Sequence, residues 1–248
     1  GTDCGTTFTS ANCAGGTTNG SSAVPVYEIT PTTTTSAGVF VNNNAVLPMA
    51  TITFTRRTYN VVSETPGMRP VACAGGQRYN MQVQSLWTGA RHPADYPSNA
   101  HFSPIVVASH SGNYQMWASG SPASVGVQTV AEMGNSSSLT SDLSTAQTAG
   151  TVLQYLTGSG ADQQTVNITV GSGHVYVSFM TMLAPSPDWF TGFQDLSLCR
   201  GGNWVDAITI TVQPWDAGTD CGTTFTSANC AGGTTNGSSA VPVYEITP

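Results

Sequence analysis

The sequence predicts an all-β fold, an antiparallel β-sandwich that carries two short helices. Runs of alternating or β-branched residues recur along the chain and are separated by turn residues, as in sheet proteins. Only two segments show a helical spacing of apolar residues instead. The chain also repeats itself with a period of 217 residues, a length that fits one large β domain better than two smaller ones.

The clearest strand covers residues 50–62, with the sequence ATITFTRRTYNVV. Ile52, Phe54 and Arg56 fall on one face and three threonines fall on the other, which is the pattern of a half-buried strand. Four further strands are expected at Tyr79–Trp87, Gln164–Val170, Val175–Leu183 and Ala207–Val212.

Two segments between these strands are expected to be helical. Ser121–Met133 has a proline near its start, and its apolar residues fall roughly on one side. Thr140–Leu156 repeats apolar residues at helical spacing, with Asp142 in the first turn, where a negative charge favours the helix dipole. The apolar positions are Val125, Val127, Val130 and Met133 in the first helix, and Leu143, Ala146, Leu153 and Leu156 in the second.

Residues 1–31 recur without a substitution at 218–248. Such a repeat has three explanations: a window cut from a tandem array, an internally duplicated end, or an engineered duplication. The array requires the fewest assumptions, so we expect a protein made of repeated copies.

The composition points to a secreted protein. Only 8% of residues are charged, no lysine is present, and Thr, Ser, Gly and Asn take the surface positions that charged residues usually fill. The net charge of −7 repels phosphate backbones and anionic lipids, so nucleic acid is not an expected partner. No apolar run is long enough for a membrane span, and no signal peptide is visible, so we expect a fragment of a mature chain.

The cysteines predict disulfides rather than a metal site, because they are even in number and form no CxxC or Cys/His cluster. Cys4 and Cys13, like Cys221 and Cys230, are close enough in sequence to close a local hairpin. Counting then leaves Cys73 and Cys199 for each other. Candidate N-glycosylation sequons lie at Asn19, Asn135, Asn167 and Asn236.

Four stretches together resemble the spondin N-terminal domain, of the F-spondin and mindin type. The resemblance runs from about Cys73 to the end, and its SPDWFxG and PxDAGTDxG blocks are highly specific. It implies a spondin-like sandwich, and it agrees with a Cys73–Cys199 disulfide. The four stretches are HFSPIVVASHSGNYQMWASG (101–120), VQTVAEMG (127–134), APSPDWFTGFQDLSLC (184–199) and QPWDAGTDCGTTFTS (213–227).

The resemblance also shifts the expected domain limits. The family's domain continues past the EIT motif through a polar loop into a closing strand, and here that continuation follows only the first copy of the repeat, at 32–62. We therefore expect 1–62 to be the C-terminal part of a preceding module including its closing strand, 63–72 to be a linker, and 73–248 to be the next module without its closing strand. Residues 32–62 could close the module in the same chain, in a neighbour by strand exchange, or along a covalent array.

The family is similar to calcium-dependent sandwiches, and its calcium-binding aspartates correspond to Asp188 and Asp216 here. Calcium takes about six to eight oxygen ligands. The position that matches the family's third carboxylate is Thr169, which carries no charge, so Asp220, Asp195, backbone carbonyls or water would have to replace it. The competing interpretation is that the two aspartates cap turns.

Enzyme activity is not expected. None of His92, His101, His110 and His174 sits in a GxSxG or HExxH context, and we expect a structural role for His110. The five tryptophans could form a sugar platform but are expected in the core.

The sequence therefore predicts an extracellular structural protein whose modules join end to end with copies of themselves into a fibre, appendage or matrix strand. The alternative is a calcium-dependent adhesin for a cell-surface receptor or glycan.

Overall fold

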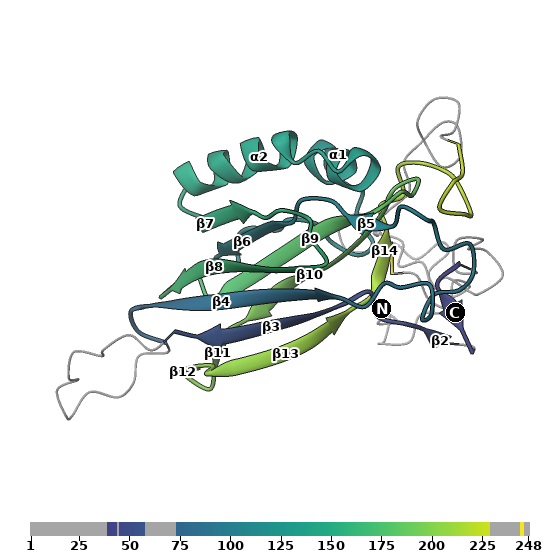
Figure 1. Cartoon of the computed structure of the whole chain (residues 1–248). Coiled ribbons are helices and arrows are strands. Elements are labelled where there is room, and N and C mark those ends of the chain that lie inside the picture. The colour runs from purple at the N-terminus through teal and green to yellow at the C-terminus, as the bar shows by residue number, and fades with distance from the viewer. Residues whose placement is uncertain (1–38, 44, 58–72, 229–243, 246–248) are drawn as a thin grey trace, which may run out of the picture.

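Two β-sheets pack face to face, and two helices cover the outer face of one of them (Figure 1). This computed structural model describes residues 39–43, 45–57, 73–228 and 244–245, and the account below concerns those residues. The arrangement confirms the predicted all-β sandwich with two short helices.

The smaller sheet has the strand order β13-β3-β4-β8, with every pair antiparallel. Its strands alternate as the sequence predicted: Ile52 and Phe54 are fully buried, whereas the three threonines of the same strand lie on the outer face. Four of the five expected strands form this sheet, with ends that differ from the prediction by a few residues, and the fifth is β9 of the larger sheet. The four are β3 (Ala50–Arg56), β4 (Gly76–Ser85), β8 (Gln163–Gly171) and β13 (Ala207–Val212), and residues 58–62 of the first predicted strand lie outside the described residues.

The larger sheet has the order β15-β14-β10-β9-β6-β7, with β5 also paired to β9. Gly192 of β10 lies opposite Met180 of the neighbouring antiparallel strand β9, and a Cβ atom there would collide with the carbonyl oxygen of Phe179. The strands are β5 (His101–Phe102), β6 (Val106–His110), β7 (Val152–Thr157), β9 (Tyr176–Ala184), β10 (Trp189–Ser197), β14 (Pro214–Asp216) and β15 (Tyr244–Glu245). Two small hairpins are β1 (Val41–Asn42) with β2 (Ala45–Val46), and β11 (Cys199–Arg200) with β12 (Asn203–Trp204).

The apolar residues form two cores, one on each face of the larger sheet. The main core lies between the sheets and includes Phe54 from one and Phe179 from the other. The second core lies under the helices, where Val127 and Leu143 pack with Met180. Neighbouring residues of β6 and β9 therefore serve opposite layers, which explains why these strands read as nearly continuous apolar runs.

The first helix, α1 (Val125–Met133), is shorter than predicted and buries a different face. Ser124 caps its start by accepting a hydrogen bond from the Val127 backbone N–H, and Gly134 ends it in the left-handed conformation. Val127 and Val130 are buried as expected, but Val125 is 68% exposed and Met133 is 63% exposed, so their predicted place on the buried side is wrong.

The second helix, α2 (Ser137–Thr148), starts earlier and ends earlier than predicted. Leu153 and Leu156 belong to β7 instead, because Gly150 turns the chain with a φ of 76° and the following residues pair with β6. The earlier start also places Asp142 beyond the first turn, where its expected effect on the helix dipole is lost.

Strand β3 lies in the middle of the smaller sheet, between β13 and β4 of its own chain. Thr53 is opposite Thr209 on one side and Gln82 on the other. The expected closing strand therefore fills its place within the chain, as in a permuted fold. The limits 1–62, 63–72 and 73–248 stay a prediction, because most of 1–62 and nearly all of the linker lie outside the described residues.

Candidate functional site

Two buried aspartates meet at one end of the sandwich because β10 pairs with β14. Trp189, the first residue of β10, lies opposite Asp216, the last residue of β14, and Asp188 directly precedes Trp189. Asp188 is 1% exposed and Asp216 is 3% exposed. The structure thus brings together the two carboxylates that the sequence motifs singled out.

Asp188 fixes the turn that follows β14. Its Oδ2 accepts hydrogen bonds from the backbone N–H groups of Thr219 at 2.6 Å and Asp220 at 3.0 Å. Its Oδ1 is buried without a hydrogen-bond partner among the described residues. Burial, and then the negative charge of Asp216, raise the pKa of Asp188 to about 8.

Asp216 and Asp220 hold the same turn. Asp216 accepts hydrogen bonds from the Gly218 backbone N–H at 2.8 Å and from the Trp189 indole N–H at 3.2 Å. Asp220 is also buried, and its Oδ1 accepts from the Cys221 backbone N–H at 2.8 Å. These contacts are those of turn-capping aspartates, which is the structural role considered in the sequence analysis.

The donor chemistry fits a hard cation, since the cluster offers carboxylate oxygens and one of them, Asp188 Oδ1, meets no hydrogen-bond donor in the described part of the chain. The geometry is less complete. In the part of the chain that the structure describes, no three His, Cys, Asp or Glu side chains are placed to hold a metal ion. A calcium ion here would therefore take Asp188 and Asp216 as carboxylate ligands and draw its remaining ligands from backbone carbonyls and water.

The other two suggested ligands lie elsewhere. Thr169 is in β8, in the opposite sheet, where it faces Arg78 of β4 and its backbone N–H donates to Gln154. Asp195 lies toward the far end of β10, in a bulge with a φ of 55°. Spacing along the sequence could not show where Thr169 lies, because it does not tell which sheet β8 joins.

His110 is fully buried and joins Ser178 and Asp195 in a small network. Its Nε2 lies 2.7 Å from Ser178 Oγ and 3.6 Å from Asp195 Oδ1, whereas its Nδ1 lies 2.8 Å from the backbone oxygen of Ser111. In a catalytic triad the serine and the acid approach opposite ring nitrogens. Here both approach the same one, so the arrangement has the form of a structural network.

An aromatic cluster beside the aspartates was not foreseen from the sequence. Phe225 is 1% exposed, and its ring centroid lies between 5.1 and 5.2 Å from those of Trp189, Trp87 and Phe40. Its backbone N–H donates to Asp95 Oδ2 at 3.0 Å. Trp87, Trp117, Trp189 and Trp204 are all buried, as the expectation of core tryptophans requires, and Trp215 is half-buried.

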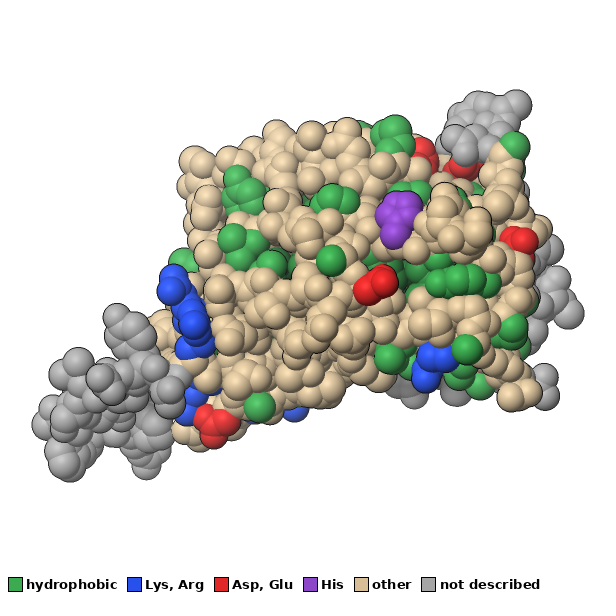
Figure 2. All heavy atoms as spheres, in the orientation of Figure 1, with side chains coloured by type: hydrophobic (Ala, Val, Ile, Leu, Met, Phe, Trp, Pro, Cys, Tyr) green, Lys and Arg blue, Asp and Glu red, His purple; other side chains and the backbone are tan. Residues whose placement is uncertain are grey.

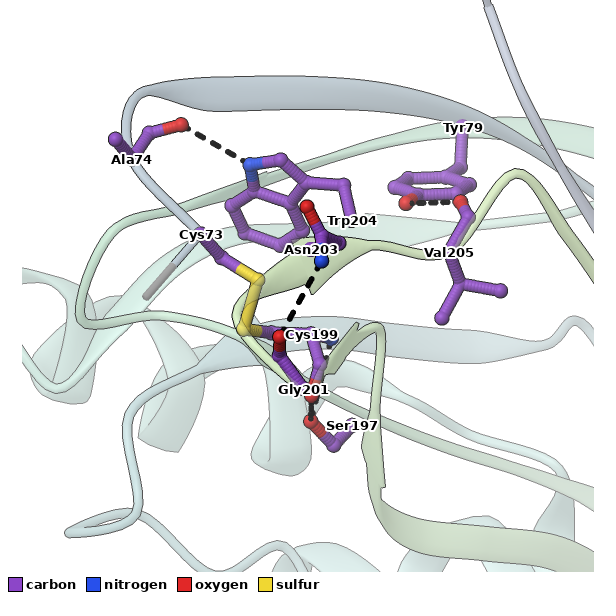
Figure 3. The surroundings of a disulfide bond; sticks show 9 residues. All are labelled: Cys73, Ala74, Tyr79, Ser197, Cys199, Gly201, Asn203, Trp204 and Val205. Carbon is purple, nitrogen blue, oxygen red and sulfur yellow. Dashed lines mark hydrogen bonds between the residues drawn. A yellow bond between two sulfur atoms is a disulfide. The ribbon is translucent and has the colours of Figure 1, made fainter. Parts of the chain in front are cut away.

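The opposite end of the sandwich is held by a disulfide, shown in Figure 3. Cys73 and Cys199 are bonded with a Cα–Cα distance of 5.8 Å, which confirms the predicted pair. Around it, the Trp204 indole donates to Ala74 at 3.1 Å and the Tyr79 hydroxyl donates to Val205 at 2.6 Å. The bond ties the entry to β4 in one sheet to the hairpin after β10 in the other.

The remaining predicted sites are only partly visible. Cys221 is disulfide-bonded, and Cys4, Cys13 and Cys230 lie outside the described residues, so the predicted local pairs stay a prediction. Asn135 is exposed, and its side chain accepts a hydrogen bond from the Ser137 N–H at the start of α2. Asn167 is exposed on β8, whereas Asn19 and Asn236 lie outside the described residues.

Neither α1 nor α2, the helices of the described residues, has the length and hydropathy to cross a membrane.

A two-layered sandwich that bears helices on one face, a disulfide at one end and paired aspartates at the other defines a spondin-type β-sandwich domain. The chain belongs to the spondin family: residues 77–245 match Spondin_N. It is therefore an extracellular domain of a family of matrix proteins, as its disulfides also indicate.

Similarity to individual relatives is moderate. In an alignment of 174 positions, the chain is 34% identical to spondin-2 of Rattus norvegicus, and the alignment covers 66% of this chain and 50% of the relative. In an alignment of 184 positions, it is 34% identical to spondin-1 of Homo sapiens, and the alignment covers 69% of this chain and 22% of the relative. The match thus covers half of the one relative and less than a quarter of the other.

Proposed function

We propose that this chain is a structural module of an extracellular fibre, appendage or matrix strand in which copies of the domain join end to end. The observation that carries the proposal is the identity of residues 1–31 and 218–248. Identical repeats suit mechanical length better than recognition of varied ligands. The proposal includes no catalytic activity. The His110 network supports this part of it, because Ser178 and Asp195 approach the same ring nitrogen.

The packing around the repeat supports the proposal. Phe40 follows the first copy of the repeat, yet its ring contacts Phe225 in the second copy at 5.2 Å. Strand β3, which also follows the first copy, completes the sheet of the domain that ends in the second. The segment after one copy thus fits against the other, and in an assembly the same fit is available along a covalent array or by strand exchange.

The test is the mass of the intact native protein under denaturing and reducing conditions, together with a negative-stain image of the native material. A mass many times 25.6 kDa indicates a covalent array, and a mass near 25.6 kDa with filaments indicates non-covalent joining. Isolated particles of 25.6 kDa, at every concentration tried, would contradict the proposal.

A second candidate is a calcium-dependent adhesin for a cell-surface receptor or glycan, favoured by the buried Asp188 Oδ1, which has no donor among the residues that the structure describes. A cation there would hold Asp188 in its charged form and so release a proton at neutral pH, because the pKa is otherwise raised to about 8. Calorimetric titration of calcium in two buffers of different ionisation enthalpy measures that proton. Asp188→Asn should abolish the signal; a titration without heat or proton release in the unaltered protein excludes the site.

A further inference from the structure

We propose that successive copies meet head to tail through opposite charges, with an arginine surface (Arg57, Arg78 and Arg200) on one copy facing an acidic surface (Asp95 and Asp162) on the next. This inference rests on the proposed end-to-end assembly and specifies the joint. It commits to a second copy of this chain as the partner of both surfaces.

The arginine surface starts with a like-charge pair. Arg57 directly follows β3, and its backbone N–H donates to the Arg78 carbonyl of β4 at 2.9 Å, so the two residues lie opposite each other. Both side chains are exposed. Like charges directly opposite on neighbouring strands destabilise a sheet. A pair of this kind is explained if an acidic partner covers it.

Arg200 extends this surface. It lies in β11, next to Cys199, whose disulfide to Cys73 brings β11 to the entry of β4. Its side chain is exposed. Among the described residues, Arg56 forms an ion pair with Asp206, and the other arginines form none. Arg57, Arg78 and Arg200 are therefore available to a partner.

The acidic surface lies at the other end of the same strands. The Asp162 carbonyl accepts the backbone N–H of Ser85, the last residue of β4, seven positions from Arg78 or roughly 23 Å along the strand. Asp95 also lies at this end, because it bonds the backbone of Phe225 beside Trp87, and both carboxylates are exposed.

Three buried aspartates also lie at this end: Asp188, Asp216 and Asp220. Because the pKa of Asp188 is raised to about 8, that residue adds little negative charge at neutral pH. Of the described arginines, Arg91 is the one at this end: it lies between Trp87 and Asp95, and Asn42 of the β1 hairpin donates to its carbonyl. Asp142 and Glu132 belong to the helices, and Asp195 faces His110, so these three carboxylates are not part of the surface.

Figure 2 shows this separation in part on one face: most of the blue side chains lie at one end of the sandwich, beside a red carboxylate, and most of the red carboxylates lie toward the other end, where a blue side chain is also present. The surface between the two ends is largely uncharged. The outer face of the smaller sheet presents residues such as Thr53, Gln82 and Thr165. Attraction between copies is therefore restricted to the ends. Since the two surfaces differ and lie on opposite ends, the contact repeats without closing, which builds a filament.

A charge-swap experiment on the 248-residue chain tests the inference. One variant carries Arg57→Glu and Arg78→Glu, and the other carries Asp95→Arg and Asp162→Arg. Each variant alone presents two ends of like charge, so its self-association in about 0.01 M salt should weaken at least tenfold. The two variants mixed in equal amounts should recover assembly, as an alternating polymer. The control Arg91→Glu makes a like change of charge at the acidic end and should leave assembly intact or strengthen it.

Sedimentation velocity measures association, and circular dichroism verifies that each variant is folded. Because Asp95 also caps the Phe225 N–H, Asp162→Arg alone serves as a second variant if the double one unfolds. Wild-type assembly that neither variant weakens, or that about 1 M salt leaves unchanged, overturns the inference while the proposed function stands. Wild type that never assembles overturns the inference, and the mass of the intact native protein then decides the proposed function on its own. Arginine-dependent binding of a sulfated polysaccharide by a chain that stays monomeric also overturns the inference.

Discussion

Asp188 holds the turn after β14 through a single oxygen atom. Its Oδ2 accepts two backbone N–H groups that lie on the turn after β14. A buried acceptor of this kind organises a turn by satisfying donors that have no other partner. The same residue is therefore important for stability whether or not a cation binds to it.

Removal of that acceptor should be costly. Asp188→Ala leaves the N–H groups of Thr219 and Asp220 without their acceptor, and we expect the free energy of unfolding to fall by about 2–4 kcal/mol. Asp188→Asn keeps one oxygen acceptor and should cost less. Urea denaturation in the presence of a chelator measures both, with the exposed Asp142→Asn as a control expected within about 0.5 kcal/mol. Equal stability of the alanine variant and the wild type would contradict this role.

His110 makes stability depend on pH. Burial, as the largest cause, lowers its pKa below the ordinary 6.5, although Asp195 opposes the shift and His174 adds to it. The unfolded chain then binds the proton more readily, so stability should be lost as pH falls below about 6.5 and should level off once the folded histidine also titrates. Tyr114 and Tyr176 pack on its ring.

Thermal unfolding between about pH 5 and 8 detects the change, and the slope attributed to His110 should disappear in His110→Asn. His92 is buried with a lowered pKa as well, so His92→Asn is the matched variant and removes a separate part of the slope. A His110→Asn curve parallel to that of the wild type would show that the histidine does not titrate between the two states.

Residue-level prediction succeeded where few alternatives existed. Counting left Cys73 only one partner, and two specific motifs identified Asp188 and Asp216. The contact of Phe225 with Asp95 spans 130 residues and joins two loops, so no periodicity or spacing announces it. Thr169 was misplaced for a related reason, because its distance from Asp188 depends on the sheet that β8 joins.

At the scale of elements, the disulfide secures the end opposite the aspartates. It joins residues separated by 126 positions and spans the two sheets. A cross-link over a loop of this length restricts the unfolded chain strongly, so Cys73→Ser with Cys199→Ser should lower the free energy of unfolding by about 2–4 kcal/mol. Urea denaturation of the oxidised protein checks the value. A loss below about 1 kcal/mol would mean that packing of Trp204 and Tyr79 suffices to hold this end.

The sequence predicted five of the strands and only part of the helices, and β6 and β10 of the larger sheet were not foreseen. Strands such as β13 alternate strongly and need no knowledge of their neighbours. The end of α2 was missed because the spacing of Leu153 and Leu156 fits a helical period, although both residues belong to strand β7. Pairing with β6 decides between the two, and that pairing is a property of the tertiary fold.

At the scale of the whole molecule, the question is which copy supplies β3. The strand is hydrogen-bonded on both sides, to β13 and to β4, so exchange with a neighbour requires both ladders to open. Surface charges at the two ends can join copies without opening either ladder. We therefore expect each domain to keep the β3 of its own chain in monomers and in assemblies.

A cross-link between Thr53→Cys and Thr209→Cys tests that expectation. The two residues are opposite each other in register, and their hydroxyl oxygens lie 2.9 Å apart, so the cysteines are within reach of a disulfide. On a non-reducing denaturing gel we expect a product of 25.6 kDa from assembled material, because the bond closes within one chain. A ladder of multiples that collapses on reduction would instead mean that a neighbour supplies the strand. In that case the filament is held by strand exchange, and the charged ends serve only to align the copies.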